Sequence, residues 1–241
     1  MNWVDIVVIV ILAISVIQGW RKGLILAIVG FIKWFVGFAV AKVFYKTITA
    51  FFIANIWNPI PGISLKVQGF LYETMGLDPS LNFTMTPEQL RLAFSKLTLP
   101  DMYKTALDGM IPTSPMSVSN FMTILADKMS LVLVEALGFL MVMLVAIGLF
   151  SLVGKVINTI SKLPVLNELN RGGGLLIGGL IGLITVYFLM AMLNYLYPLP
   201  IATSVTSAIE NSKIAVYFYK YNVLSYFLNS LFQANKIFGN A

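Results

Sequence analysis

Four apolar segments, each about as long as a membrane is thick, constrain this chain more than any other feature. They cover residues 3–19, 24–45, 131–153 and 175–197. A helix needs about 20 apolar residues to cross the hydrocarbon core of a bilayer. Only 11% of the residues are charged, whereas a soluble domain carries about a quarter. The segments therefore predict an all-α membrane protein with four transmembrane helices.

The predicted spans form two transmembrane hairpins, at 1–46 and 129–197. The segment between them, 47–128, holds seven of the ten prolines and is predicted to be an extracytoplasmic helical insertion between spans 2 and 3. The tail, 198–241, is rich in aromatic residues. Such a composition favours one or two extracytoplasmic amphipathic helices along the membrane surface.

Capping signals mark where helices of the insertion begin. Thr86-Pro87-Glu88-Gln89 combines an N-cap, a proline at the first helical position and a capping-box glutamine. Asp101 and Ser117 are further N-cap candidates. No alternating pattern is long enough to predict a sheet.

Basic residues beside the spans predict the orientation. The turn after the first span carries Arg21 and Lys22, and the turn after the third carries three more basic residues, Lys155, Lys162 and Arg171. Glu168 is the one acidic residue in these turns. Cytoplasmic turns are enriched in lysine and arginine. Both turns are therefore predicted to be cytoplasmic, with both termini extracytoplasmic.

A row of glycines predicts close helix packing. Gly174, Gly178 and Gly182 recur at every fourth position of the last span, so on a helix they form one face, a glycine zipper. Such a face lets another helix approach closely in lipid. The partner is either another helix of this chain or a second copy. Gly19 and Gly23 are predicted to permit a sharp turn between the first two spans.

A polar elbow of Asn167, Asn170 and Arg171 precedes the glycine row and is predicted to be a turn. The favoured interpretation is an orientation anchor with hydrogen-bonded amides. The alternative is a cytoplasmic recognition surface for a partner or a lipid head group.

Lys33 lies near the middle of the second span, roughly 13 Å from its inner end. It shares a helical face with Gly30, Gly37 and Ala41, so we expect it to point into the bundle. A charge inside a membrane is expensive and is by default a functional hypothesis. A function or an internal partner is one interpretation, and snorkelling of the side chain toward an interface is the equal alternative, although roughly 13 Å is a long reach for one lysine.

Three further charges lie near the outer ends of the predicted spans. Lys42 and Glu135 lie at similar depths, which favours a structural ion pair. Asp5 is expected either to be solvated at the outer interface or to join this pair.

The residues present argue against catalysis. The chain has no histidine and no cysteine, which excludes histidine-based catalysis, thiol chemistry and the usual structural zinc sites. No nucleotide-binding loop or hydrolase motif is present. We expect no enzyme activity, cofactor or bound metal. The net charge of +6 is explained by orientation and by anionic lipid in the bilayer, without nucleic acid.

The turn residues resemble those of a known family. Asp5 followed by Gly19, Arg21 and Gly23 is similar to the opening of the colicin V production protein family. Leu169-Asn170-Arg171, followed by Gly174 and Gly178, resembles its second signature. Trp34 also fits. The resemblance covers roughly 1–46 and 131–197, and the long segment 47–128 departs from the shorter members.

This resemblance implies a bacterial inner-membrane protein with four spans, linked to colicin V production and export and to envelope homeostasis. It implies no established enzyme activity. Related domains occur fused to extracytoplasmic serine proteases, which suggests an anchoring or regulatory module.

Two hypotheses of different classes follow. The first is a non-enzymatic membrane protein that assists toxin production, export or envelope homeostasis through helix packing and contacts with other membrane proteins or a second copy. The alternative is a small transporter or lipid-handling protein in which Lys33 binds an anion inside an oligomer. The sequence identifies neither a substrate nor a partner.

Overall fold

The computed structural model describes residues 1–80, 83–95, 111–160, 167–197 and 199–225. These residues are mostly helical and divide into two compact units. The first unit comprises the described residues within Met1–Ile48, Leu137–Leu193 and Ser204–Ala241, and the second comprises those within Thr49–Ala136 and Asn194–Thr203.

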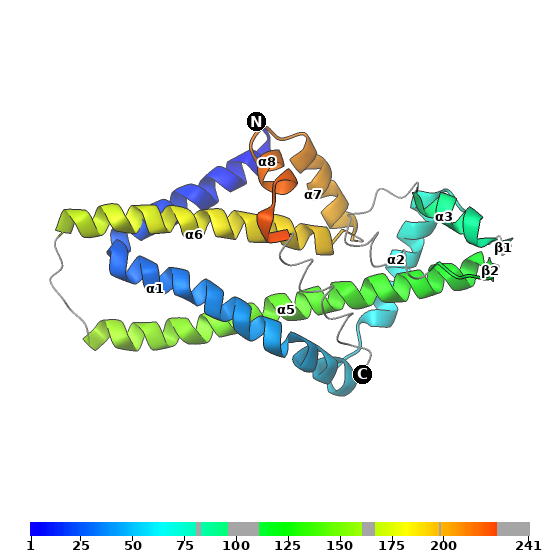
Figure 1. Cartoon of the computed structure of the whole chain (residues 1–241), viewed down its shortest axis with the longest axis horizontal. Helices are drawn as coiled ribbons and strands as arrows, with labels where there is room; N and C mark the ends of the chain where they lie inside the picture. Colours follow the sequence, from blue (N-terminus) through cyan, green and yellow to red (C-terminus); the bar gives the residue numbers. More distant parts are fainter. Residues whose placement is uncertain (81–82, 96–110, 161–166, 198, 226–241) are drawn as a thin grey trace. The chain divides into compact units, whose positions relative to one another are not determined.

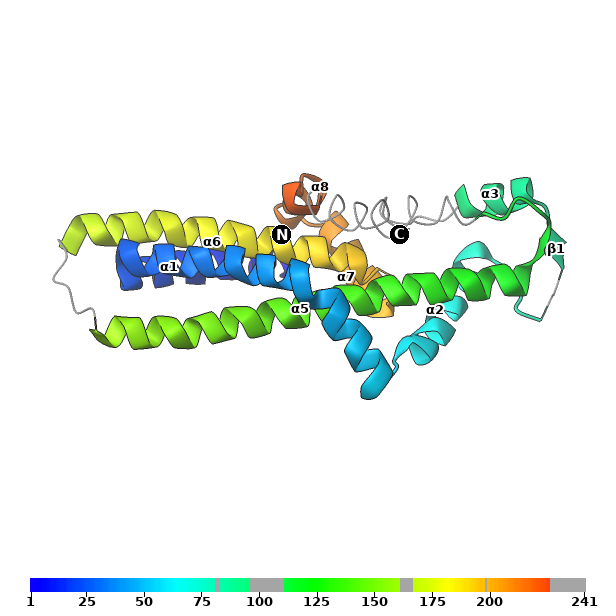
Figure 2. The ribbon, with the colours of Figure 1, turned by 60° about the horizontal axis from the view of Figure 1, so that its bottom comes forward.

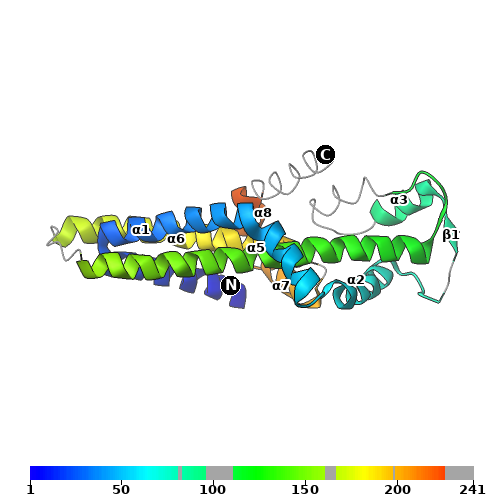
Figure 3. The same ribbon diagram turned by 90° about the horizontal axis from the view of Figure 1, so that it is seen from below.

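Three long helices build the first unit. They are α1 (Trp3–Asn55), α5 (Val118–Ile160) and α6 (Asn167–Tyr195), and the parts of them in this unit run side by side (Figures 1, 2 and 3). α1 leaves helical geometry at Gly23, where φ is 77° and ψ is 171°. The chain changes direction there (Figure 1). We call residues 3–22 the first arm of α1 and residues 24–48 its second arm.

Among the described residues, three helices are long and apolar enough to cross a membrane. They are Trp3–Asn55, Val118–Leu152 and Glu168–Asn194. The first two predicted spans, 3–19 and 24–45, correspond to the two arms of α1. The predicted count of four spans and their pairing in hairpins therefore stay predictions.

Two predicted turns are helical in the structure. Gln18 to Lys22 continue the first arm, and only Gly23 departs from helical geometry. The predicted elbow of Asn167, Asn170 and Arg171 lies within α6. Polar residues often mark a helix end, but tertiary contacts override local propensity, and here Asn170 and the glycines of α6 pack against α1.

The second unit holds the insertion. α2 (Ile60–Met75) ends at Gly76, whose left-handed conformation caps the helix. α2 packs against the start of α5 and α3 (Pro87–Ser95). Their buried core residues are Val67, Leu71, Leu90, Phe121, Met122 and Leu125. Contrary to the sequence-based expectation, β1 (Thr84–Met85) pairs antiparallel with β2 (Met116–Ser117), because two residues per strand leave no readable alternation.

The predicted capping box is confirmed. The Thr86 N–H donates to Gln89 Oε1 at 3.0 Å, and the Gln89 N–H donates to Thr86 Oγ1 at 3.4 Å. The Ser117 cap is also confirmed, since its Oγ accepts from the Asn120 N–H at 3.4 Å. Asp101 lies outside the described residues.

Two short helices, α7 (Pro200–Glu210) and α8 (Ala215–Lys220), follow α6. Residues of this region, Ile209 and Ala215, share a buried core with Val4, Val8 and Val186. The prediction of helices in the tail is therefore confirmed for Pro200–Glu210 and Ala215–Lys220, and their position along a membrane surface stays a prediction.

Candidate functional site

The break in α1 at Gly23 is the centre of the candidate site. A positive φ suits glycine because a β-carbon would crowd the backbone. The break also frees the backbone N–H groups that begin the second arm, and such groups need an acceptor. Asn170 of α6 supplies it: its Oδ1 accepts from the Leu24 N–H at 2.7 Å. The side chain of Asn170 thus acts as an N-cap for a helix 146 residues away in sequence.

The amide of Asn170 also fills the space beside Gly23. A β-carbon built on Gly23 would collide with its Nδ2 and lie 2.8 Å from its Cγ. Glycine is therefore required at this position for two reasons: the positive φ of the backbone and the Asn170 amide that occupies the space of a side chain.

The glycine row of α6 lies against the first arm of α1. A β-carbon on Gly174 would lie 2.8 Å from the Gly23 Cα, and one on Gly178 would lie 2.5 Å from the Ser15 carbonyl oxygen. Gly182 has more room, with the Ser15 Cβ at 3.0 Å. The sequence left the partner of this row open, and in the structure it is a helix of the same chain.

Gly19 belongs to this contact rather than to a turn. A β-carbon there would collide with the Gly174 carbonyl oxygen and lie 2.7 Å from the Gly178 Cα. The two backbones therefore touch along this stretch without intervening side chains, a geometry in which dispersion and weak Cα–H···O contacts hold helices together.

Cations surround the break. The Arg171 guanidinium carbon lies 6.0 Å from the centre of the Trp20 ring, at the outer limit of a cation–π contact. Arg21 is exposed, and the exposed Lys22 donates to Gln18 Oε1 at 3.4 Å. A surface rich in cations around a half-exposed tryptophan is typical of the boundary between hydrocarbon and water.

Lys33 is half-buried in the first unit, and its Nζ donates to the Ser151 Oγ of α5 at 3.3 Å. The Ser151 hydroxyl in turn donates to the Ile147 carbonyl at 2.7 Å. Lys33 therefore has an internal partner, and that partner is neutral. The neighbouring face is tightly packed, because a β-carbon on Gly37 would lie 2.5 Å from Ile147 Cγ1.

Asp5 is fully buried, so the first of its two expected environments, a solvated outer interface, was wrong, whereas its joining Lys42 and Glu135 stays a prediction. Its Oδ1 accepts from the N–H groups of Ile214 at 2.8 Å and Ala215 at 3.1 Å, and its Oδ2 accepts from the Lys213 N–H at 3.1 Å. Asn2 adds a bond from its Nδ2 to the Ala208 carbonyl. Asp5 therefore caps the start of α8 and fastens the amino terminus of α1 to the α7–α8 region.

The remaining predicted site residues lie elsewhere. Lys42 is exposed in the first unit, whereas Glu135 belongs to the second unit, and their pairing stays a prediction. Lys155 lies in α5, but its side chain is not among those that the structure describes. Lys162 lies outside the described residues.

Sequence reasoning missed Ser15 and the capping role of Asn170. Ser15, Gly19 and Gly23 are spaced by four, like the glycines of α6, so matching two rows of small residues could have paired these helices. Asparagine is a favoured capping residue, but nothing local in sequence indicates that it caps a distant helix. Among the described residues, no three acidic side chains lie close enough to hold a metal.

Replacing Gly178 with alanine should destabilise the protein by about 1–3 kcal/mol, the usual range for overpacking, because the new methyl meets the Ser15 carbonyl. Gly172 is the matched control on the same helix, since a β-carbon there has no neighbour within 4 Å. Gly172→Ala should be neutral or stabilising by up to about 1 kcal/mol. Thermal unfolding in detergent measures both, and equal effects would contradict the close contact.

Removing the acceptor at Asn170 should expose the break. Asn170→Ala leaves the Leu24 N–H unsatisfied, at about 1–3 kcal/mol. Asn170→Asp keeps an oxygen acceptor and should retain most of the stability. Hydrogen exchange of the Leu24 amide should accelerate in the alanine variant alone; unchanged exchange in both variants would show that Asn170 does not cap this helix.

Comparison with known protein families gives one match. The sequence model described as "Colicin V production protein" matches residues 4–73 and 113–223. The first matched region covers α1 from residue 4, and the second covers α6, so the two helices of the Gly23 contact both lie within the match. Neither the curated proteins nor the solved structures contain a match to this chain. The apolar helices fit a membrane protein of this type, and the chain belongs to the colicin V production protein family.

Proposed function

We propose that this chain is a non-enzymatic multi-pass protein of the bacterial inner membrane that assists toxin production and export or envelope homeostasis. The observation that carries the proposal is that polar side chains of this chain bind the backbone of neighbouring helices. Asn170 and Asp5 both bind backbone N–H groups of other helices. These contacts support a role as a packed scaffold that presents surfaces to partner proteins, rather than as a reactive centre.

The proposed arrangement has four spans. Each arm of α1 crosses the membrane once, and α5 and α6 cross once each. The breaks at Gly23 and between α5 and α6 face the cytoplasm, where Arg21, Lys22 and Arg171 are favoured. Both termini and the second unit are extracytoplasmic.

Cysteine labelling tests this topology, because the chain has no cysteine of its own. A cysteine at Lys22 should react with a membrane-impermeant maleimide only after the cells are permeabilised. A cysteine at Glu88 should react in intact cells. The reverse pattern would invert the proposed orientation. Labelling of both positions in intact cells would place Lys22 and Glu88 on the same side of the membrane, so the second arm of α1 would not cross it.

Toxin release tests the proposed role. In a bacterium that makes colicin V and lacks its own family member, expression of this chain should restore the zone of inhibition on a sensitive lawn. Gly178→Ala should restore less than Gly172→Ala. A correctly inserted chain that restores nothing would contradict the role in toxin production.

One observation favours the alternative, a transporter that binds an anion. Lys33 donates a side-chain hydrogen bond to a neutral hydroxyl, that of Ser151. Lys33→Met should keep toxin release near wild type under the scaffold proposal. A stable Lys33→Met variant without activity would favour transport.

A further inference from the structure

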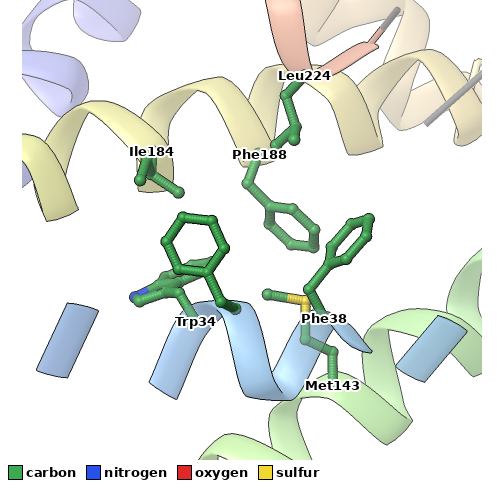
Figure 4. A pocket seen from close by; sticks show the side chains of 7 residues that line it. Trp34, Phe38, Met143, Ile184, Phe188 and Leu224 are labelled. Atoms are coloured by element: carbon green, nitrogen blue, oxygen red, sulfur yellow. The ribbon is translucent and has the colours of Figure 1, made fainter. Parts of the chain in front are cut away.

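The first unit contains an apolar pocket that neither the family match nor the glycine contact explains. Its volume is about 250 Å³, slightly below the range of about 300–1,000 Å³ for small-molecule sites. Figure 4 shows side chains of α1, α5 and α6, together with Leu224, facing this space. The lining includes Trp34, Phe35, Phe38, Met143, Ile184 and Phe188.

The pocket surface offers no polar partner. Apart from the indole N–H of Trp34 these side chains carry no polar hydrogen-bonding group, and the surface that faces the pocket is apolar, so the pocket suits a hydrocarbon group and disfavours a polar ligand, whose hydrogen bonds would be lost. Met143 and Phe188 form the buried floor, whereas Phe35 is 57% exposed. The pocket therefore opens at the surface of the unit, beside Phe35.

Two lysines lie on the same side of α1 as the pocket. At 100° per residue, Lys42 and Lys46 fall on the helical face of Phe35 and Phe38. Both lysines are exposed. Lys42 lies about 10 Å along the helix from Phe35, so an acyl chain in the pocket would leave its head group near the lysines.

The depth agrees with this arrangement. With Gly23 at one face of the bilayer, Lys42 lies roughly 28 Å further along the second arm. This is close to the hydrocarbon thickness of about 30 Å, so the two lysines reach the phosphate layer of the opposite face. The pocket then opens into the hydrocarbon of that leaflet.

We propose that the pocket holds one acyl chain of an anionic phospholipid whose phosphate binds Lys42 and Lys46. The proposal rests on the crossing of the membrane by the second arm and on no particular orientation. Residues 226–241, which follow the pocket residue Leu224, are the competing occupant. They carry no acidic side chain, so their side chains offer the lysines no opposite charge.

The test reconstitutes the full chain in vesicles of equal phosphatidylglycerol and phosphatidylethanolamine, extracts it in mild detergent and counts retained lipid by native mass spectrometry. About one phospholipid per chain is expected, enriched in phosphatidylglycerol. Lys42→Met with Lys46→Met should lower the enrichment by about fivefold per lysine. The control changes two exposed lysines of the second unit, Lys66→Met with Lys128→Met, and should leave the enrichment intact.

A second pair of variants tests the pocket. Ile184→Trp fills it and should abolish retention, whereas Leu176→Trp, on the exposed side of the same helix, should not. Because the lysine variants alter only exposed side chains, they remain informative if Ile184→Trp fails to fold.

Photo-crosslinking identifies the occupant. A benzophenone amino acid at Phe35 should form adducts with phosphatidylglycerol in excess over phosphatidylethanolamine. Adducts with residues 226–241 or with a second copy would overturn the proposal, as would a wild-type chain that retains no lipid or retains both lipids equally. If the chain inserts with the proposed topology but fails these lipid tests, the lipid site is refuted and the proposed function is unaffected.

Discussion

The hydrogen bond from the Leu24 N–H to Asn170 Oδ1 satisfies a constraint on which the rest of the first unit depends. A helix that breaks where another helix packs against it leaves backbone N–H donors that the helix itself cannot satisfy. The acceptor must then come from another helix, and that helix must come very close. Close approach requires Gly19, Gly174 and Gly178, where a β-carbon would overlap the opposite backbone. The Asn170 cap therefore depends on the close approach that the glycine row permits.

The opposite end of the first arm uses the same chemistry. Asp5 accepts N–H groups at the start of α8, and Asn222 Nδ2 donates to the Tyr187 carbonyl of α6 at 2.8 Å. In each case a polar side chain binds the backbone of a segment far away in sequence. An unsatisfied backbone group in an apolar environment is expensive, so each of these side chains stabilises the fold by pairing one.

The second arm differs from the first. Much of its contact with the neighbouring helices runs through aromatic rings, as the Trp34–Phe188 pair with α6 and the Phe38–Phe139 pair with α5 illustrate, with centroids 5.7 and 5.3 Å apart. Large rings pack less completely than backbone against backbone, and the apolar pocket lies among them. The same unit therefore combines a tight contact with a looser one, and the looser one has room for a lipid chain.

The sequence by itself determined that the chain is helical and apolar enough for a membrane, because those properties depend on composition and on runs of similar residues. It also located the cap of α3 and the special role of Gly23, because each depends on residues a few positions apart. Only the tertiary structure decided that the glycine row packs on the first arm of α1, that Asn170 is helical and caps Leu24, and that Asp5 is buried against α8. Each of those contacts joins residues more than 140 positions apart. Such contacts depend on which helices meet and at what height, and no local pattern of residues records that.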